Sequence, residues 1–419
     1  MFTRIQAHHF RCLKLIDQPL GRFEALVGPN ASGKTTFLDV LVLLSDLMRS
    51  RGNAHEAVAH RSADFSKLLW KAEGSSFQVA VEAAIPGEIL GSLLGSDQLF
   101  QKVRYELEIG LDEKSNEIGL NHERLWLTSA TDEPSPTTGP LFPDSKLEEP
   151  SILWEEGSDR RISIAKSEKD FDYYYPDNRK LSQVTFRLKR SRSALANIPL
   201  DDERFPIGNW FREMLETGVQ NVILDSQKIR QPSPPGLGLS FQTDGSNLPW
   251  VIDELSKNKK KFTLWLEHLR TALEDIVDIR VLERENDRQR YLVIDYANGV
   301  SVPSWLVSDG TLRLLALTIP AYIEKFEGTY VIEEPENGIH PRALETVIQS
   351  LTSIYDGQVL LATHSPIVIA QLEPQQILCF AKDSSGATDI VSGDHHPNLL
   401  EWKRGKPDLG ILFASGILS

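Results

Sequence analysis

The stretch GPNASGKTT, from Gly28 to Thr36, has residue types and a spacing that suit phosphate binding. It fits the pattern G-x-x-x-x-G-K-[ST], in which glycines let backbone N–H groups turn toward phosphate oxygens. The start of the helix that follows adds positive potential. Lys34 would reach the terminal phosphates, and Thr35 would offer a hydroxyl to Mg²⁺. The residues predicted to contact a nucleoside triphosphate are Gly28, Asn30, Ser32, Gly33, Lys34, Thr35 and Thr36.

Two adjacent glutamates, Glu333 and Glu334, end an apolar, strand-like run and are followed by a proline. Adjacent side chains on a strand point to opposite faces, so the pair is either a solvated strand end or a site that needs negative charge. Beside a phosphate loop, Glu333 would support Mg²⁺, and Glu334 would accept a proton from the attacking water as general base. The phosphate loop upstream favours this second interpretation.

Two further stretches carry polar residues at comparable places. His364, in VLLATHSP, follows another short apolar run, where its ring could hydrogen-bond the γ-phosphate or the attacking water. A histidine taken alone is more often structural. Ser308 is predicted to cap an apolar helical pattern with Gly310 in its first turn, and such a helix start can bind phosphate. A cap without a ligand is the alternative for Ser308.

Each of these residues is expected at the end of a strand or the start of a helix. The apolar run Ala25 to Val27 precedes the phosphate loop, and the runs before Glu333 and His364 are also too short for helices. Because the carboxyl ends of parallel strands meet at one edge of a sheet, the loop, the glutamates and the histidine are expected to converge there.

This ordered set of motifs resembles the ABC-type ATPase heads, in particular the OLD-like (overcoming lysogenization defect) AAA-family ATPases, and more distantly the SMC and RecF-like heads. About half of the chain carries the resemblance. Its opening strands contain a Phe-Arg element at Phe10 and Arg11. The motifs GPNASGKT, LVSDGTLRLLAL, YVIEEPENGIHP and LATHSP are similar to the Walker A loop, the signature, the Walker B strand with its D-loop, and the switch histidine.

The resemblance implies an α/β fold, namely an ABC-type P-loop ATPase head with a mixed or parallel sheet, flanking helices and a large inserted α+β lobe. It also implies ATP and Mg²⁺ as cofactors, with Thr35 and Glu333 at the metal, and Glu334 and His364 as catalytic residues. Two such heads would dimerise head to tail. Ser308 and Gly310 of one head would then close over the γ-phosphate held by Lys34 of the other.

Several residues depart from the family pattern. Glu333 stands where an aspartate is commoner. Asp309 replaces the glycine of the transporter signature, and we expect its carboxylate to face the amides of the first helical turn. Gln78 is a candidate for the glutamine of the Q-loop by its strand context alone. Asn337 and His340 either take D-loop roles or shape the turn after the proline.

The order of the motifs predicts four segments. About 270 residues separate the phosphate loop from the signature, which predicts an inserted lobe. Strands are expected at 102–111 and 123–129, a loop at 132–143, and helices at 209–219 and 262–277. The segments are 1–95, an N-terminal ATPase lobe with Walker A; 96–300, the inserted β-hairpin and helical lobe; 301–380, a C-terminal ATPase lobe with signature, Walker B and switch histidine; and 381–419, a tail that could dock a partner.

Bulk properties narrow the class of protein. The chain has 419 residues, a formal charge of −14 and two distant cysteines without metal-ligand spacing. With no apolar run of about 20 residues and no leader-like start, the sequence predicts a cytoplasmic protein without a membrane partner. The negative charge argues against coating nucleic acid by bulk electrostatics. Two basic runs, 187–192 and 257–261, are either solvated faces or phosphate contacts.

The expected function is an ATPase switch. A homodimer or higher homo-oligomer would act as a sensor in antiviral defence and control a separate effector, either a nuclease or a toxin. About 55 residues follow His364, too few for the Toprim nuclease domain of full OLD proteins. His395 and His396 are expected in a loop, and Asp408 to Ser419 could dock a partner. The alternative is a RecF- or SMC-like ATPase that binds DNA in repair or maintenance.

Overall fold

The computed structural model describes residues 1–92, 100–112, 114–129, 151–155, 160–166, 171–177, 181–323, 326, 328–396 and 410. The loop expected at 132–143 lies outside these ranges, as do residues 397–409 and 411–419 of the expected tail at 381–419. The chain forms two compact units, unit 1 (Met1–Gly21, Thr35–Val219 and Lys382–Ile390) and unit 2 (Arg22–Lys34, Gln220–Ala381 and Val391–Ser419). The four-segment division drawn from the motifs stays a prediction.

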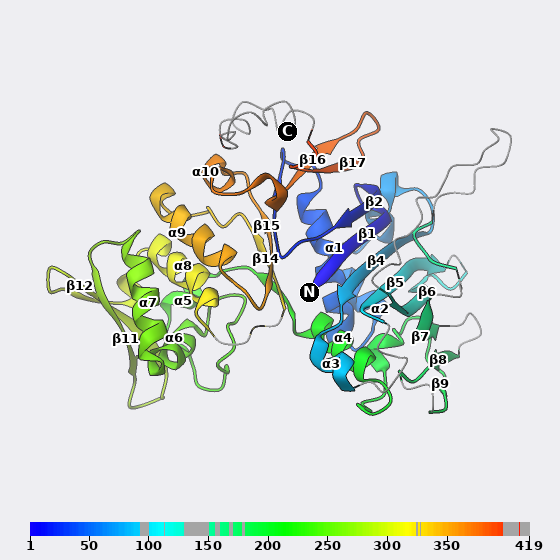
Figure 1. The fold of residues 1–419 in the computed structure, drawn as a ribbon, viewed down its shortest axis with the longest axis horizontal. Helices are drawn as coiled ribbons and strands as arrows, with labels where there is room; N and C mark the ends of the chain where they lie inside the picture. Colours follow the sequence, from blue (N-terminus) through cyan, green and yellow to red (C-terminus); the bar gives the residue numbers. More distant parts are fainter. Residues whose placement is uncertain are drawn as a thin grey trace. The chain divides into compact units, whose positions relative to one another are not determined.

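Unit 1 is built on an antiparallel sheet of eight strands, in the order β2-β1-β4-β5-β6-β7-β8-β9 (Figure 1). Its strands are β1 (Phe2–Phe10), β2 (Leu13–Pro19), β4 (Ser76–Ala84), β5 (Lys102–Asp112), β6 (Glu117–Thr128), β7 (Arg161–Lys166), β8 (Asp172–Tyr174) and β9 (Val184–Phe186). Strands β5 and β6 are the two that the alternation of apolar and polar residues predicts at 102–111 and 123–129. The two predicted strands and their antiparallel pairing are therefore confirmed.

Short helices accompany this sheet. They are α2 (Ala54–Ala59), α3 (Gly87–Ser92) and α4 (Pro206–Glu216), with the 3-10 turns η1 (Phe65–Leu68), η2 (Trp70–Ala72) and η4 (Leu195–Asn197). Helix α1 (Lys34–Arg49) begins at the last residue of a unit 2 segment and continues in unit 1. The helix predicted at 209–219 is confirmed as α4, although it ends at Glu216 because β10 (Val219–Val222) follows.

Helix α4 is capped from a distant loop. Phe205, the residue before the helix, provides no side-chain cap, and the Asp177 carboxylate accepts a hydrogen bond from Ile207 N at 2.8 Å. Ser163 Oγ donates to the same carboxylate at 3.2 Å. Asp177 is only 1% exposed, so a residue 30 positions away satisfies an amide that would otherwise be buried without a partner.

We expect Asp177 to make the stability of this unit depend on pH. Burial raises the pKa of Asp177 from its usual 3.8 to about 6, against the hydrogen bonds from Ile207 and Ser163. Because the folded-state pKa lies above the unfolded one, the stability that protonated Asp177 contributes is full below about pH 4 and is lost as pH rises through about 6. Asp177→Asn should match the parent near pH 4 and exceed its unfolding free energy at pH 7 by about 2–3 kcal/mol.

Urea unfolding of the full chain at both pH values measures this difference, and Asp177→Ala is the matched control. Alanine removes the cap as well as the charge, so it should lower stability at both pH values by about 1–3 kcal/mol. Equal stability of the asparagine variant and the parent at pH 7 would contradict the burial argument.

The sheet of the predicted ATPase head lies mainly in unit 2, while the first part of its last strand, at 388–390, belongs to unit 1. Its strand order is β10-β14-β15-β3-β16-β17, and β14, β15, β3 and β16 run parallel. The strands are β3 (Phe23–Val27), β14 (Thr329–Glu333), β15 (Gln358–Ala362), β16 (Ile377–Lys382) and β17 (Thr388–Ser392). Strands β3 and β15 are buried along their whole length, as expected for parallel strands covered on both faces.

The helices that accompany this sheet are α5 (Ser226–Arg230), α6 (Leu248–Lys257), α7 (Lys259–Arg270), α8 (Asp309–Thr318), α9 (Pro341–Thr352) and α10 (Pro366–Ala370), with η5 (Ser304–Leu306), η6 (Ile319–Ala321) and η7 (Pro374–Gln376). In Figure 1, α8 and α9 lie beside β14 and β15. One apolar cluster joins strand residues such as Ile332 of β14 to helix residues such as Leu315 and Val347. The core of unit 2 therefore holds the Walker B strand against the signature helix.

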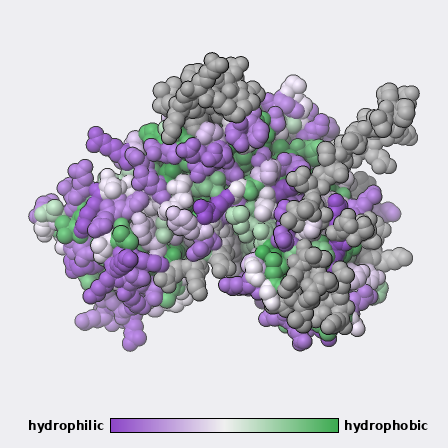
Figure 2. Space-filling view, viewed as in Figure 1, coloured by the Kyte–Doolittle hydropathy of each residue, from purple (hydrophilic) through white to green (hydrophobic). Residues whose placement is uncertain are grey.

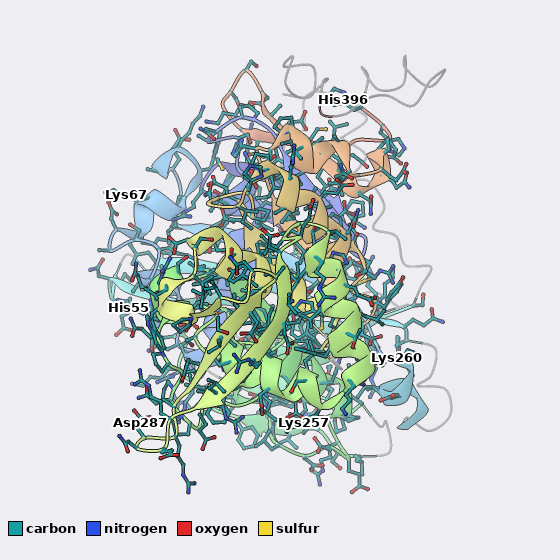
Figure 3. All side chains as sticks on the ribbon, turned by 90° about the vertical axis from the view of Figure 1, so that its left-hand side faces the viewer. His55, Lys67, Lys257, Lys260, Asp287 and His396 are labelled. Atoms are coloured by element: carbon teal, nitrogen blue, oxygen red, sulfur yellow. The ribbon has the colours of Figure 1, made fainter. Side chains whose placement is uncertain are left out.

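A second, three-stranded antiparallel sheet belongs to unit 2, formed by β11 (Ile276–Glu283), β12 (Arg290–Tyr296) and β13 (Ser301–Pro303). Asp287 marks the tip of its first hairpin (Figure 3). The helical pattern expected at 262–277 runs too far, because α7 ends at Arg270 and Ile276 already belongs to β11. Over these helices and the hairpin, the face drawn in Figure 2 is mostly hydrophilic, as amphipathic packing requires.

The predicted fold class, an α/β head with an inserted lobe, is confirmed by the parallel sheet and the antiparallel sheet together. In the described ranges, no helix is long and apolar enough to span a membrane.

Candidate functional site

Three parallel strands bring the sequence motifs to one edge of the unit 2 sheet. Glu333, the last residue of β14, pairs with Ala362 at the end of β15, and Ala362 pairs with Leu26 near the end of β3. The phosphate loop follows β3, Glu334 follows β14, and His364 lies two residues beyond β15. The predicted convergence of loop, glutamates and histidine is therefore what the structure shows, while their chemical roles stay predictions.

The loop after β3 has the backbone that phosphate binding requires. Gly28, Ala31 and Gly33 all have positive φ angles, of 148°, 61° and 108°. A Cβ on Gly28 would lie 2.2 Å from the carbonyl oxygen of Phe380, so only glycine fits there. Such turns direct successive N–H groups to one side of the chain, where they can surround an anion.

The side chain of Lys34 folds back onto the phosphate loop. Its Nζ donates hydrogen bonds to the carbonyl oxygens of Gly28 and Pro29, each at 2.9 Å. Burial lowers the pKa of the Lys34 ammonium, and the negative charges of Glu334, Glu333 and Glu336 partly oppose that effect. Lys34 and the glutamates at and after the end of β14 therefore interact electrostatically at the sheet edge. The loop is preformed around a cation that a triphosphate can contact.

Glu334 has an unusual backbone conformation. Its φ angle is +48°, which non-glycine residues rarely adopt, and its N–H donates to Ala362 O at 2.8 Å. The side chain is exposed, and its Oε2 accepts a hydrogen bond from Asn337 Nδ2 at 2.5 Å. The neighbouring strand and the following turn thus fix a carboxylate in place at the sheet edge. Strain of this kind is frequent at functional sites.

Asn337 and His340 shape the turn after Pro335, one of the two alternatives that the sequence leaves open. Asn337 donates to Glu334 through its side chain and through its N–H, the latter to the backbone carbonyl oxygen at 3.0 Å. His340 caps α9, because its Nδ1 accepts from Arg342 N at 3.3 Å. Both residues therefore support the position of Glu334.

Glu336 is a site residue that sequence reasoning missed. Its Oε1 accepts hydrogen bonds from Thr363 Oγ1 and from His364 N, both at 2.8 Å. The other oxygen, Oε2, is buried without a hydrogen-bond partner in the part of the chain that the structure describes. Glu336 therefore ties the turn after β14 to the segment that carries the switch histidine. The only sequence signal was a third glutamate three residues after Glu333.

We expect Glu336→Ala to loosen this connection. Removing the carboxylate leaves the Thr363 hydroxyl and the His364 amide without their partner, which should lower the unfolding free energy by about 1–3 kcal/mol. Glu336→Gln is the matched control, because its amide oxygen can accept both bonds, and it should cost less than about 1 kcal/mol. Thermal and urea unfolding of the full chain measure both variants. Equal losses for the two would show that the hydrogen bonds do not stabilise the edge.

The signature region begins with the predicted cap. Ser308 Oγ accepts from Thr311 N at 3.2 Å at the start of α8. Gly310 lies against the turn after Glu334, since a Cβ there would be 2.7 Å from Gly338 O. These intramolecular contacts account for the serine and the glycine without a second head. Their predicted contact with the γ-phosphate of another head stays a prediction.

The expectation for Asp309 is wrong. Its carboxylate does not take the amides of the first turn, which Ser308 serves, but accepts from Arg230 Nη2 at 2.5 Å and from Arg230 Nε at 3.0 Å. The guanidinium also donates to Trp305 O at 3.3 Å. Two nitrogens of one guanidinium therefore donate to the same carboxylate oxygen, Oδ1, and the charge of Arg230 offsets that of Asp309.

Other predicted site residues belong to unit 1. Thr35 and Thr36 follow Lys34 in α1, and Thr36 Oγ1 accepts from Cys12 Sγ at 3.4 Å. Arg11 of the Phe-Arg element donates to Asp39 at 3.3 Å. Gln78 lies within β4, where its amide oxygen accepts from Ile152 N at 3.2 Å. The sheet therefore uses the Gln78 side chain to hold a neighbouring segment.

Comparison with protein families identifies the chain. A family model described as "AAA domain, putative AbiEii toxin, Type IV TA system" matches residues 23–370. The chain belongs to this AAA-domain family. The match includes the phosphate loop, the signature helix and the two strand ends described above, so it covers the proposed site. As this is a family of P-loop ATPases, membership implies that the loop of the AAA domain binds ATP.

Two solved structures resemble this chain along most of its length. An Smc head bound to the C-winged helix domain of ScpA has a TM-score of 0.51 at 16% identity and covers 93% of this chain and 97% of its own. The Smc head domain of Pyrococcus furiosus, with an extended coiled coil and bound to the C-terminal domain of ScpA, has a TM-score of 0.51 at 14% identity and covers 96% and 99%. At these identities the likeness shows a shared head fold.

One curated relative also matches. An OLD nuclease of Thermus scotoductus is 52% identical over 44 residues. The match spans a tenth of this chain and 8% of that relative. The expected resemblance is therefore confirmed as membership of an AAA-domain family and a head fold shared with Smc, together with a short stretch similar to an OLD nuclease.

Proposed function

We propose that this chain binds and hydrolyses ATP at the edge formed by β3, β14 and β15. The convergence of Lys34, Glu334 and His364 at that edge supports this function most strongly. A buried lysine in a glycine loop binds phosphate, and an exposed carboxylate held at the next strand but one can accept a proton. A glycine turn with only a structural role would not need a carboxylate nearby, and a solvated strand end would not need a lysine nearby.

Each residue has a separate task in this proposal. Lys34 binds the terminal phosphates by exchanging its bonds to the loop carbonyls for bonds to phosphate oxygens. Glu334 accepts the proton of the water that attacks the γ-phosphate, and its neighbour Asn337 orients the carboxylate. The ring of His364, whose backbone is held by Glu336, is placed to contact the γ-phosphate and report its presence.

The acidic strand end suits Mg²⁺. Within the described ranges, no group of three or more acidic, histidine or cysteine side chains could hold a metal by itself. Mg²⁺ in nucleotide sites is typically bound by one or two side chains, by substrate phosphates and by waters, and it neutralises charge that develops on the phosphates. Glu333 would contribute the carboxylate side and Thr35 the hydroxyl. Omission of Mg²⁺ should therefore abolish phosphate release.

We further propose that ATP controls a head-to-tail homodimer, or a higher homo-oligomer, that acts as a sensor in antiviral defence. Two findings support this proposal: the family description names a toxin system, and the curated relative with a short match is an OLD nuclease. The effector would be a separate nuclease or toxin. In the dimer, Ser308 and Gly310 of one chain would contact the phosphate bound by the partner chain.

The dimer proposal has a sharp test at Ser308. Asparagine and aspartate are both good helix caps, so Ser308→Asn and Ser308→Asp should both keep α8 folded. The aspartate would repel a γ-phosphate from the other head, whereas the asparagine would not. We expect ATP to dimerise the parent and the asparagine variant, measured by light scattering, and to leave the aspartate variant monomeric although it still binds ATP. Dimers of both variants in equal amounts would argue against a contact between Ser308 and phosphate.

A second candidate function is DNA binding in repair or maintenance. Unit 1 has a cavity of about 870 Å³ whose lining includes Arg187, Lys189, Arg190 and His55, the last labelled in Figure 3. The basic run is partly engaged, because Arg190 pairs with Asp112 at 3.0 Å. DNA binding that falls steeply with salt, and falls further in Lys189→Gln, would favour this function. Binding that ignores salt and this substitution would count against it.

A further inference from the structure

A second cavity lies at the other end of the Walker B strand. It belongs wholly to unit 2 and has a volume of about 800 Å³. Tyr330, the second residue of β14, lines it, whereas Glu333 at the opposite end of β14 belongs to the phosphate edge. Three residues of extended strand span about 10 Å. The cavity is therefore distinct from the proposed ATP site.

The inner wall of this cavity is aromatic. Phe241 and Tyr330 are 4% and 1% exposed, and the rings of Phe326 and Tyr330 lie 4.1 Å apart between centroids. Tyr322 completes this wall. Burial raises the pKa of both tyrosines, so their phenols stay neutral at physiological pH. Tyr322 and Phe326 are partly exposed, so their rings offer flat, uncharged surfaces on which a planar apolar group can stack.

The rim of the cavity is cationic. Lys257, Lys259 and Lys261 line it where α6 ends and α7 begins, and among the lining residues that the structure describes Glu254 is the acidic one. Lys257 pairs with Glu254 at 2.5 Å and keeps 64% of its side chain exposed. Figure 3 places Lys257 and Lys260 at this same end of the helix pair. Three lysines and one glutamate are thus the charged residues among the described lining.

The first turn of α7 adds to this positive potential. Asn258 caps the helix by accepting from Lys261 N at 3.2 Å, which satisfies one of the initial amides. The remaining amides of the turn and the helix dipole favour negative charge near Lys259. The lysine side chains and the helix start are independent sources of attraction for an anion at the cavity mouth.

We propose that this cavity binds a small organic anion, with its phosphate or carboxylate group at the lysines and a flat apolar body against the aromatic wall. The volume lies within the range of about 300–1,000 Å³ that small-molecule sites usually have. Aromatic and apolar lining with a few charged groups at one end is also the usual composition of such sites. A simple phosphate ion would leave the aromatic wall unused, and a neutral apolar ligand would leave the lysines unused.

The test uses 8-anilinonaphthalene-1-sulfonate as the anionic probe and N-phenyl-1-naphthylamine as its neutral counterpart, titrated calorimetrically into the full chain. We expect one saturable site for the sulfonate and affinity at least about tenfold weaker for the neutral probe. Replacing Lys257 and Lys259 together by glutamine should weaken sulfonate binding at least about tenfold. Lys260→Gln is the matched control, because Lys260 lies between lining lysines and does not itself line the cavity, so it should leave affinity unchanged.

Ser240→Trp supplies a test that leaves charge unaltered. Ser240 is exposed at the cavity lining, so an indole there should occupy the space and abolish saturable binding while the thermal transition is retained. Lys34→Met should bind the sulfonate like the parent, which separates this site from the ATP site. Binding without saturation, equal affinity for the neutral probe, or an unchanged affinity in the double lysine variant would each overturn the proposal.

Discussion

Replacing Glu334 with glutamine should stop ATP turnover and leave ATP bound, with kcat lower by about 10²–10⁴-fold. The amide has nearly the shape of the carboxylate and can still accept the hydrogen bond from Asn337, so the turn should hold its conformation. It has no basic oxygen that could take a proton from water. Phosphate release measures turnover, and calorimetric titration with ATP measures binding.

The structure gives this prediction a specific basis. The backbone of Glu334 is fixed in the left-handed region by a 2.8 Å bond to Ala362 O, so the side chain leaves the strand end in one direction. A catalytic base has to be held in this way to reach the attacking water. If the variant also accumulates the ATP-bound dimer, the proposed switch would be trapped in its closed state.

Glu345→Gln is the matched control for this experiment. It makes the same chemical change on the exposed face of α9, where Glu345 accepts only a weak bond from Gln349 at 3.4 Å. It should keep parental turnover. Near-parental hydrolysis by Glu334→Gln would mean that another group accepts the proton.

The placement of the main site residues could be predicted because it follows from local patterns. Each motif ends a short apolar strand, and parallel strands bring their carboxyl ends to one edge. Thus Lys34 and His364 could be placed together although 330 positions apart, and the pairing of β14 with β15 and of β15 with β3 bears this out. The cap at Ser308 was predictable for the same reason, since capping involves only adjacent residues.

Contacts that depend on packing could not be predicted. Asp309 pairs with Arg230, which lies 79 residues earlier. The local sequence around either residue does not predict this pairing. Glu336 reaches Thr363 and His364 across a turn whose path becomes visible only in the structure. The close approach of Gly310 to Gly338 O likewise depends on how α8 meets the turn before α9. Residue type showed that these positions were polar or small, and tertiary packing decided their partners.

Helix ends were harder to predict than helix existence. The apolar spacing at 262–277 continues past Arg270, yet α7 stops there and Ile276 starts a strand. Isoleucine and valine suit a pleated, half-buried strand as well as a helix face, so the spacing alone does not separate the two. The cavity beside α7 was equally out of reach, because its aromatic wall comes from segments up to 89 positions apart, from Phe241 to Tyr330.

Replacing Lys34 with methionine should remove ATP binding itself, with affinity at least about 10²-fold weaker. Methionine keeps an unbranched apolar stem and loses the ammonium, so the comparison isolates the charge. The loop would lose the donor that now bonds Gly28 O and Pro29 O. The site would also lose the positive charge that partly balances the negative charges of three glutamates.

Electrostatics makes this the largest effect on binding that we expect. The charges of Glu334, Glu333 and Glu336 all act on Lys34, so without the ammonium a triphosphate would approach uncompensated carboxylates. The unbranched methionine side chain suits a buried position, so the chain should still fold although the loop loses two hydrogen bonds. Calorimetric titration with ATP in Mg²⁺ tests the prediction, and Lys67→Met, which changes an exposed lysine of η1, should bind ATP like the parent. Parental affinity in the Lys34 variant would show that the loop does not hold the phosphates, and the proposed ATPase site would then have no basis.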